Sequence, residues 1–204
     1  ALESIRSLKY FMASEKQRMN DEIVERCIWS RFEKAYAEVL LVDDVVPPRY
    51  IGLVKRGPKQ DCFPNQFTGT GGVLEQTDID PISGVRREWE EEIGVGTIDP
   101  QELGRMIIDG RRIVFLFFSH CPQADLPKPH PQDGVFVGEL EWIPIEEVLN
   151  KDLVVTTRCF LEEWKKRNWS TVRQFTVFLE REDPTDIGSI IKKVEVREGL
   201  VLEK

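Results

Sequence analysis

The chain has 204 residues, which is long enough to bury a substantial hydrophobic core. Hydrophobic residues make up 41% of it and charged residues 31%, a globular composition that excludes an intrinsically disordered chain. The net charge of −8 argues against a broad basic face, so no nucleic-acid partner is expected. A small phosphorylated ligand remains compatible with this charge, because a bound divalent cation reverses the local field.

The sequence contains no sign of export or of membrane insertion. Segment 1–17 lacks a long apolar run, and the strongly apolar stretch 113–118 is far too short to span a bilayer, which predicts a cytoplasmic protein without membrane association. The four cysteines include no CxxC pair, which favours free thiols. His120, Cys121 and His130 are close in sequence, but their spacing matches no zinc motif.

In chain order, residues 1–32 alternate charged and apolar positions and predict an amphipathic, partly helical extension. The other predicted elements are defined by apolar runs with turn-forming residues between them. They are strands at 36–42 and 50–55, a polar glycine-rich loop at 65–72, a strand at 112–119, a proline-rich loop at 121–133, a strand at 135–143, a helical turn at 145–148, a helix at 156–167, and two C-terminal elements, strands or a strand and a helix, at 172–179 and 193–201.

A further helix, after the glycine-rich loop, is marked at both ends. Asp80 is suited to cap it, Pro81 fits its first position, and Gly94 stands where a left-handed residue ends a helix. At helical spacing, four large apolar residues fall on one stripe, which predicts packing against a sheet. They are Ile82, Val85, Trp89 and Ile93.

The same helix carries a cluster of glutamates. Glu88 and Glu92 lie four residues apart on one side of the apolar stripe, with Glu91 next to them. Like charges this close destabilise an isolated helix, whereas a hard divalent cation such as Mg²⁺ or Mn²⁺ is well matched to clustered carboxylates. Arg87 precedes the cluster and is placed to hold a carboxylate in position. The alternative interpretation is a solvated acidic helix face.

The run from Arg87 to Val95, REWEEEIGV, resembles the second half of the Nudix box, R-E-U-x-E-E-x-G-U, in which U is a bulky apolar residue. Every required residue type is present in register. In the first half, the family has a glycine, five residues, a glutamate and seven residues before the arginine. Counting back from Arg87 reaches Ile79 and Val73 instead. One inserted residue in the loop before the helix restores the glycine and puts Asp78 in place of the glutamate.

The resemblance implies an α+β fold, a Nudix-like α/β/α sandwich with a mixed sheet. It would cover residues 34–168, with 1–33 as an N-terminal extension and 169–204 as a C-terminal extension packed on the same domain. The stretch WIPIEE at 142–147 is similar to the segment that usually closes this domain. Family habit also favours a homodimer.

The resemblance further implies metal-dependent hydrolysis of a pyrophosphate bond in a nucleoside diphosphate linked to another moiety. The cofactor would be Mg²⁺ or Mn²⁺, and the partner a small phosphorylated substrate. The implied ligands are the carboxylates of Glu88, Glu91 and Glu92 and the carbonyl of Gly72, while Arg87 would orient the glutamates. Glu91 and Arg87 are thereby implied to be catalytic as well.

Outside the box, the positions of several charged residues make them candidates for the site. Lys55 and Arg56, at the end of the second strand, are candidates for binding substrate phosphates. Glu139 is the first candidate for a general base and Asp133 the second, because both lie just before Trp142. The alternative for each of these residues is an ordinary charged side chain on the surface, without a role in the site.

Two other functions remain open. A non-catalytic module that binds a nucleotide or a protein would use the same fold without turnover. An isopentenyl-diphosphate isomerase would need a cysteine near residues 68–71, and Cys62 lies upstream of them. No segment marks a particular nucleoside diphosphate derivative as the substrate.

Overall fold

The computed structural model describes residues 29, 31–94, 96–121, 138–186 and 189–200. The strands in these ranges are β1 (Lys34–Val42), β2 (Tyr50–Arg56), β3 (Phe67–Thr68), β4 (Thr70–Val73), β5 (Gln101–Ile108), β6 (Arg112–His120), β7 (Gly138–Pro144), β8 (Phe175–Arg181) and β9 (Ile191–Glu198). The helices are α2 (Pro81–Glu92), α3 (Val155–Lys166) and the 3-10 turn η2 (Val148–Asn150).

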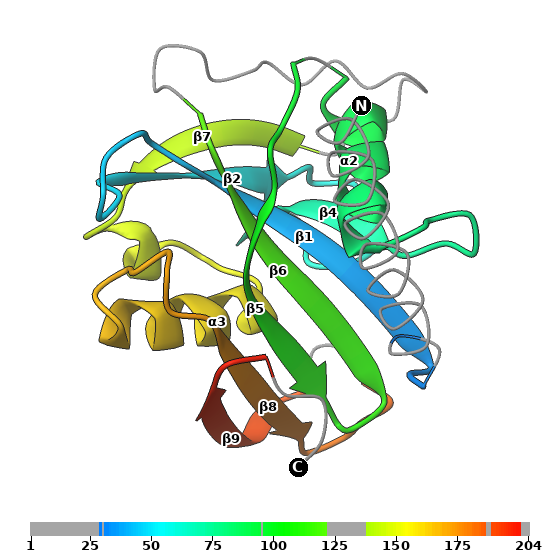
Figure 1. Cartoon of the computed structure of the whole chain (residues 1–204). Helices are drawn as coiled ribbons and strands as arrows, with labels where there is room; N and C mark the ends of the chain where they lie inside the picture. The colour runs from blue at the N-terminus through cyan, green and yellow to red at the C-terminus, as the bar shows by residue number, and fades with distance from the viewer. Residues whose placement is uncertain (1–28, 30, 95, 122–137, 187–188, 201–204) are drawn as a thin grey trace, which may run out of the picture.

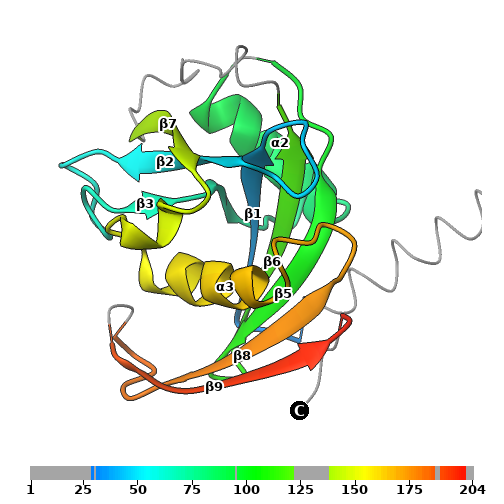
Figure 2. The same ribbon diagram turned by 90° about the vertical axis from the view of Figure 1, so that its left-hand side faces the viewer.

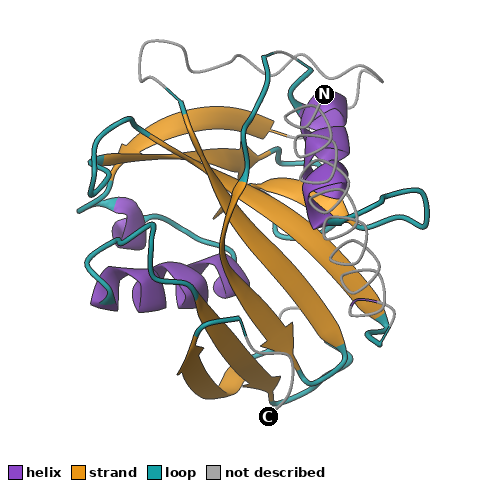
Figure 3. Ribbon diagram, in the orientation of Figure 1, coloured by secondary structure: helices purple, strands orange, loops and turns teal. Residues whose placement is uncertain are grey.

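The described strands form one mixed sheet in the order β3-β2-β1-β6-β5-β8-β9, with β4 paired to β1 and β7 paired to β2 (Figure 1). β1 pairs in parallel with β6, and β5 pairs in parallel with β8, while the other pairings are antiparallel. The curved sheet lies between the two helices, α2 on one face and α3 on the other (Figures 2 and 3). This arrangement confirms the predicted α/β/α sandwich.

The two faces of the sheet form two separate cores, because side chains alternate along a strand. Ala37 and Val39 of β1 pack on the α2 side, where Trp89 is buried. Leu40 of β1 packs on the α3 side against a core that includes Phe160. β1 therefore contributes side chains to both cores, and each helix packs on one of its two faces.

α2 begins and ends as predicted. The Asp80 side chain accepts a hydrogen bond from the Ser83 amide at 2.6 Å. The Ser83 hydroxyl in turn accepts one from the Asp80 amide, which completes a capping box. Gly94 follows the helix with a φ of 71°. Val85, Trp89 and Ile93 of the predicted stripe are buried. Burial of each such side chain stabilises the fold by about 1.5–3 kcal/mol.

The C-terminal residues extend the same sheet, since β8 pairs with β5 and β9 with β8. The predicted C-terminal elements are therefore both strands. β5 was not predicted. Its residues Leu103–Ile108 are all buried, so the segment lacks the alternation by which a half-exposed strand is recognised.

The segment predicted as a glycine-rich loop is also partly wrong, because β3 and β4 lie within it and β4 pairs with β1. Most of the N-terminal extension and most of the proline-rich loop lie outside the described residues, as does the start of the strand predicted at 135–143. Cys62 and Cys159 carry free thiols. No helix in the described part of the chain combines the length and the apolar character needed to cross a membrane.

Candidate active site

The glutamates of α2 face the glycine-rich strand β4 across a very short gap. A Cβ atom on Gly72 would lie 2.5 Å from the carboxylate atoms of Glu88, so only glycine allows this approach. One turn later, Glu92 accepts a hydrogen bond from the Gly71 amide at 3.3 Å. Two carboxylates from one side of the helix are therefore held against the backbone of β4.

Arg87 connects the acidic residues to one another. Its guanidinium donates to both oxygens of Asp78, at 3.1 Å each. It also donates to Glu88 at 3.0 Å, to Glu91 at 3.1 Å and to the Val73 carbonyl at 3.0 Å. Asp78 is buried and accepts a further bond from the Glu75 amide at 2.7 Å. Arg87 thus fixes three carboxylates and the end of β4.

Burial raises the pKa values of the two glutamates that face β4. The pKa of Glu92 rises to about 8, first because of desolvation and then because of the charge of Glu88. Desolvation also raises the pKa of Glu88, partly offset by Arg87. Ionisation of these two carboxylates is therefore less favourable than in water, and a bound cation would favour it.

The raised pKa values predict how stability depends on pH in the metal-free protein. Glu92 has an ordinary pKa of 4.5 when the chain is unfolded and about 8 when it is folded, so the folded state holds an extra proton between these values. As pH rises from about 4.5 to 8, we expect the free energy of unfolding to fall. The unfolding constant should grow by at most about tenfold per pH unit for this one proton.

Denaturant unfolding in a chelator across this pH range measures the effect. In the Glu92→Gln variant, which cannot titrate at this position, the fall should be smaller. A wild-type curve that is flat or rises with pH would contradict the predicted burial of the charge.

The residues at this position are suited to a hard divalent cation. They supply carboxylate oxygens and a backbone carbonyl, which are the ligands that Mg²⁺ and Mn²⁺ prefer. A cation would also relieve the repulsion that raises the pKa of Glu92. Within the described ranges, no group of three or more His, Cys, Asp or Glu side chains is arranged so that it could hold a metal ion by itself. An open arrangement is expected for Mg²⁺, which keeps waters and substrate oxygens as ligands.

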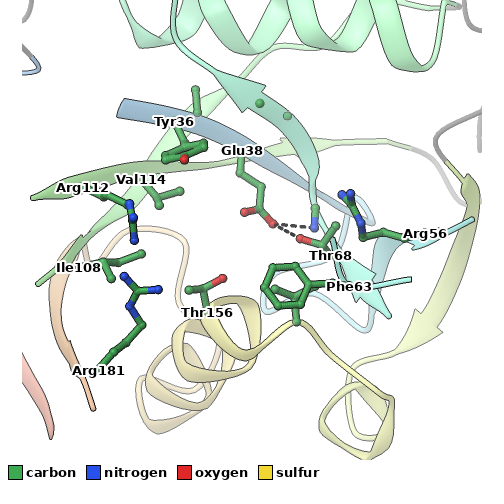
Figure 4. A pocket seen from close by; sticks show the side chains of 15 residues that line it. Tyr36, Glu38, Arg56, Phe63, Thr68, Ile108, Arg112, Val114, Thr156 and Arg181 are labelled. Atoms are coloured by element: carbon green, nitrogen blue, oxygen red, sulfur yellow. Dashed lines mark hydrogen bonds between the residues drawn. The ribbon is translucent and has the colours of Figure 1, made fainter. Parts of the chain in front are cut away.

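A pocket opens on the other side of the same glycine-rich backbone. Its volume is about 180 Å³, and Gly69, Gly71 and Gly72 form part of its wall. Figure 4 shows Glu38 near its centre, Arg56 and Phe63 on one side, and Arg112 and Arg181 on the other. Apolar side chains of β1, β5 and β6 also line it. They are Tyr36, Ile108 and Val114.

Glu38 is a site residue that sequence reasoning missed. It projects from the centre of β1 into the pocket, and its Oε1 accepts hydrogen bonds from the Gly69 amide at 2.6 Å and from the Thr68 hydroxyl at 3.0 Å. Burial raises its pKa, partly offset by these hydrogen bonds. The one available signal was a charged residue within an otherwise apolar predicted strand.

Of the residues predicted outside the Nudix box, Arg56 lines the pocket, and Lys55 and Glu139 do not. Arg56 lines it, and its guanidinium donates to the Cys62 carbonyl at 2.9 Å and to Gln60 at 3.3 Å. Lys55 and Glu139 are opposite each other on β2 and β7, are exposed, and are not among the residues that line it. Asp133 and His130 lie outside the described residues.

Comparison with known proteins agrees with this fold. Residues 38–164 match the family model described as the NUDIX domain. Similar solved structures include a MutT protein from Bacillus halodurans, with 18% identity and a TM-score of 0.53 over 80% of this chain and 97% of that one. The NUDIX domain of Shewanella oneidensis NrtR, solved with ADP ribose, has 16% identity and a TM-score of 0.51 over 66% and 87% of the two chains.

A MutT protein from Methanosarcina mazei is similar over 66% of this chain and 94% of its own, with 18% identity and a TM-score of 0.51. No curated protein matches. At these identities the solved structures show the fold alone, whereas the family model spans β1 to α3 and includes the helix with the glutamates. The chain therefore belongs to the Nudix family.

Proposed function

We propose that this protein hydrolyses a pyrophosphate bond in a nucleoside diphosphate linked to another moiety, with Mg²⁺ or Mn²⁺ as cofactor. The observation that carries the proposal is that the backbone of β4 borders both the glutamates of α2 and the pocket. Its Gly72 abuts the Glu88 carboxylate on one side and lines the pocket on the other. A phosphate lying against this backbone would meet both the carboxylates and the pocket.

The residues have separate parts in this proposal. Glu88, Glu91 and Glu92, with the Gly72 carbonyl, would hold the divalent cation. When bound, the cation would neutralise charge on the phosphoryl oxygens and lower the pKa of the attacking water. Arg87 keeps Glu88 and Glu91 in place through its hydrogen bonds. Arg56, on the pocket wall, is placed to bind a phosphate oxygen.

The reaction needs a group that accepts a proton from water as the water oxygen bonds to phosphorus and the bridging P–O bond breaks. Glu38 is better placed for this step than Glu139, because it lines the pocket next to the glycine-rich backbone. Its raised pKa makes its carboxylate a stronger base than an exposed glutamate.

Glu38→Gln therefore tests the assignment of the base. We expect kcat to fall by roughly a hundredfold, within the range for loss of a general base. The kcat of the wild type should decrease as pH falls through the raised pKa of Glu38, because the protonated carboxyl cannot accept a proton. The variant should lose this acid limb. If it keeps the limb at wild-type position, Glu38 is not the base, and Glu139→Gln is the next variant to measure.

A coupled phosphate-release screen tests the proposed function. Nucleoside diphosphate derivatives are incubated with Mg²⁺ or Mn²⁺ and a phosphatase that converts the phosphomonoester products to inorganic phosphate. ADP-ribose heads the panel, because a structural neighbour was solved with it. Turnover that a chelator abolishes supports the proposal. Binding of ADP-ribose without turnover of any panel member would instead indicate the non-catalytic module.

A further inference from the structure

The far end of the pocket holds two arginines from different parts of the chain. Arg112 begins β6, and Arg181 ends β8 in the C-terminal extension. Both line the pocket, and Figure 4 shows their guanidinium groups next to each other across from Arg56. Such a pair of like charges inside an acidic protein needs a compensating anion.

Only one of the two charges is compensated within the described residues. Arg181 donates to Asp109 Oδ2 through Nε at 2.8 Å and through Nη2 at 2.7 Å, and its other bonds reach the carbonyls of Pro184 and Asp186. Both side chains of the Arg181–Asp109 pair are buried. The Arg112 side chain, by contrast, makes no hydrogen bond or ion pair with any residue of the described ranges. One positive charge at this end of the pocket is left for a ligand.

The sheet register separates Arg112 from the glutamates. Gly72, Ala37 and Phe115 are level with one another on β4, β1 and β6. Arg112 lies three residues before Phe115, which is about 10 Å along the strand, and two strand spacings from β4 add about 10 Å across the sheet. A ligand whose pyrophosphate lies at Gly72 must therefore extend across β1 to reach Arg112.

The floor between these two points is suited to the body of such a ligand. Tyr36 and Val114, which are paired on β1 and β6, and Ile108 on β5 form an apolar surface there. A nucleoside has the flat, partly apolar shape that such a surface binds. The group that reaches the guanidinium is then an anion attached to the nucleoside and remote from the scissile bond.

We propose that Arg112 binds a second phosphate of the substrate, a phosphomonoester on the nucleoside, and that the pocket selects nucleotides that carry one. Arg181 is a positioning residue: it ties the C-terminal hairpin to Asp109 and so closes this end of the pocket. The inference rests on the proposed function for the placement of the pyrophosphate, but its test needs no turnover.

The test compares three probes that contain no pyrophosphate bond: adenosine 5′-monophosphate, adenosine 2′,5′-bisphosphate and adenosine 3′,5′-bisphosphate. Their binding is measured calorimetrically in Mg²⁺ with the wild type, Arg112→Gln and Arg111→Gln. Arg111 is the matched control, because it is adjacent and exposed, lies 3.5 Å from Glu33 and does not line the pocket. Circular dichroism and thermal unfolding establish that each variant is folded.

The wild type should bind one bisphosphate at least about tenfold more tightly than the monophosphate, as expected for an added arginine–phosphate contact. Arg112→Gln should lose this preference while its affinity for the monophosphate stays the same, and Arg111→Gln should keep it. Equal binding of all three probes by the wild type, or equal weakening of all three in Arg112→Gln, would overturn the inference. If the wild type prefers a bisphosphate and Arg112→Gln loses that preference, but no substrate is turned over, only the proposed hydrolysis is contradicted.

Discussion

Glu92→Gln is expected to lower turnover by at least about a hundredfold, which corresponds to about 2.7 kcal/mol of lost transition-state stabilisation. The substitution replaces a proposed charged ligand by a neutral amide of the same shape, and a hard divalent cation binds such an amide weakly. The amide oxygen can still accept the bond from the Gly71 amide, so the packing of α2 on β4 should be retained.

The same variant separates a loss of metal binding from a loss of the fold. Because the pKa of Glu92 is about 8, this side chain is largely protonated at neutral pH in the metal-free protein, and glutamine resembles that state. Metal-free Glu92→Gln should therefore unfold at the same temperature as the wild type or higher. It should also lose most of the stabilisation that Mg²⁺ gives the wild type.

Glu90→Gln is the matched control, since Glu90 lies on the same helix, two residues away, and is exposed. We expect it to turn over the substrate at the wild-type rate. Near-wild-type activity in Glu92→Gln, with Mg²⁺ stabilisation intact, would be incompatible with a metal site at this glutamate.

Arg87→Ala is expected to lower the free energy of unfolding by about 3 kcal/mol, because it leaves a buried carboxylate without its cation. Asp78 is only 4% exposed and accepts two of the Arg87 hydrogen bonds, so water cannot replace Arg87 in solvating its charge. Glu88 and Glu91 lose their shared donor as well. The loss is measured by denaturant unfolding, and turnover should fall with it.

The neighbouring Arg86→Ala provides the comparison. Arg86 is 53% exposed and lies 3.9 Å from Asp99, which is 88% exposed, so its removal should cost less than about 1 kcal/mol. The double variant Arg87→Ala/Asp78→Asn should recover part of the lost stability, because it removes the buried charge together with its partner. If Arg87→Ala and Arg86→Ala unfold alike, Arg87 does not organise the acidic residues.

The sequence by itself determined the helix α2 and its acidic cluster. Its start at Asp80, its stop at Gly94 and the grouping of Glu88, Glu91 and Glu92 all depend on residues within a few positions of one another. Helical geometry alone converts such spacings into a face. The resemblance to the Nudix box rested on these same local features and was confirmed by the family model.

The contact between Asp78 and Arg87 was not predicted. The sequence only put Asp78, with one inserted residue, at the glutamate position in the first half of the Nudix box, and that assignment stays a prediction. The structure has Arg87 donating to both oxygens of Asp78, while Ile79, which the uncorrected spacing puts at the glutamate position, is 55% exposed. Loop conformation brings Asp78 to Arg87, and spacing along the chain does not encode it.

Only the tertiary structure decided how the pocket is built. Glu38, Arg112 and Arg181 are brought together by strands that pair β1 with β6, β6 with β5 and β5 with β8. β5, which joins the two arginine-bearing strands, has no alternating pattern because both of its faces are buried. Sheet pairing joins residues distant in sequence through register, and no local spacing encodes that register. The acidic cluster of α2 could therefore be predicted from the sequence, whereas the pocket beside it could not.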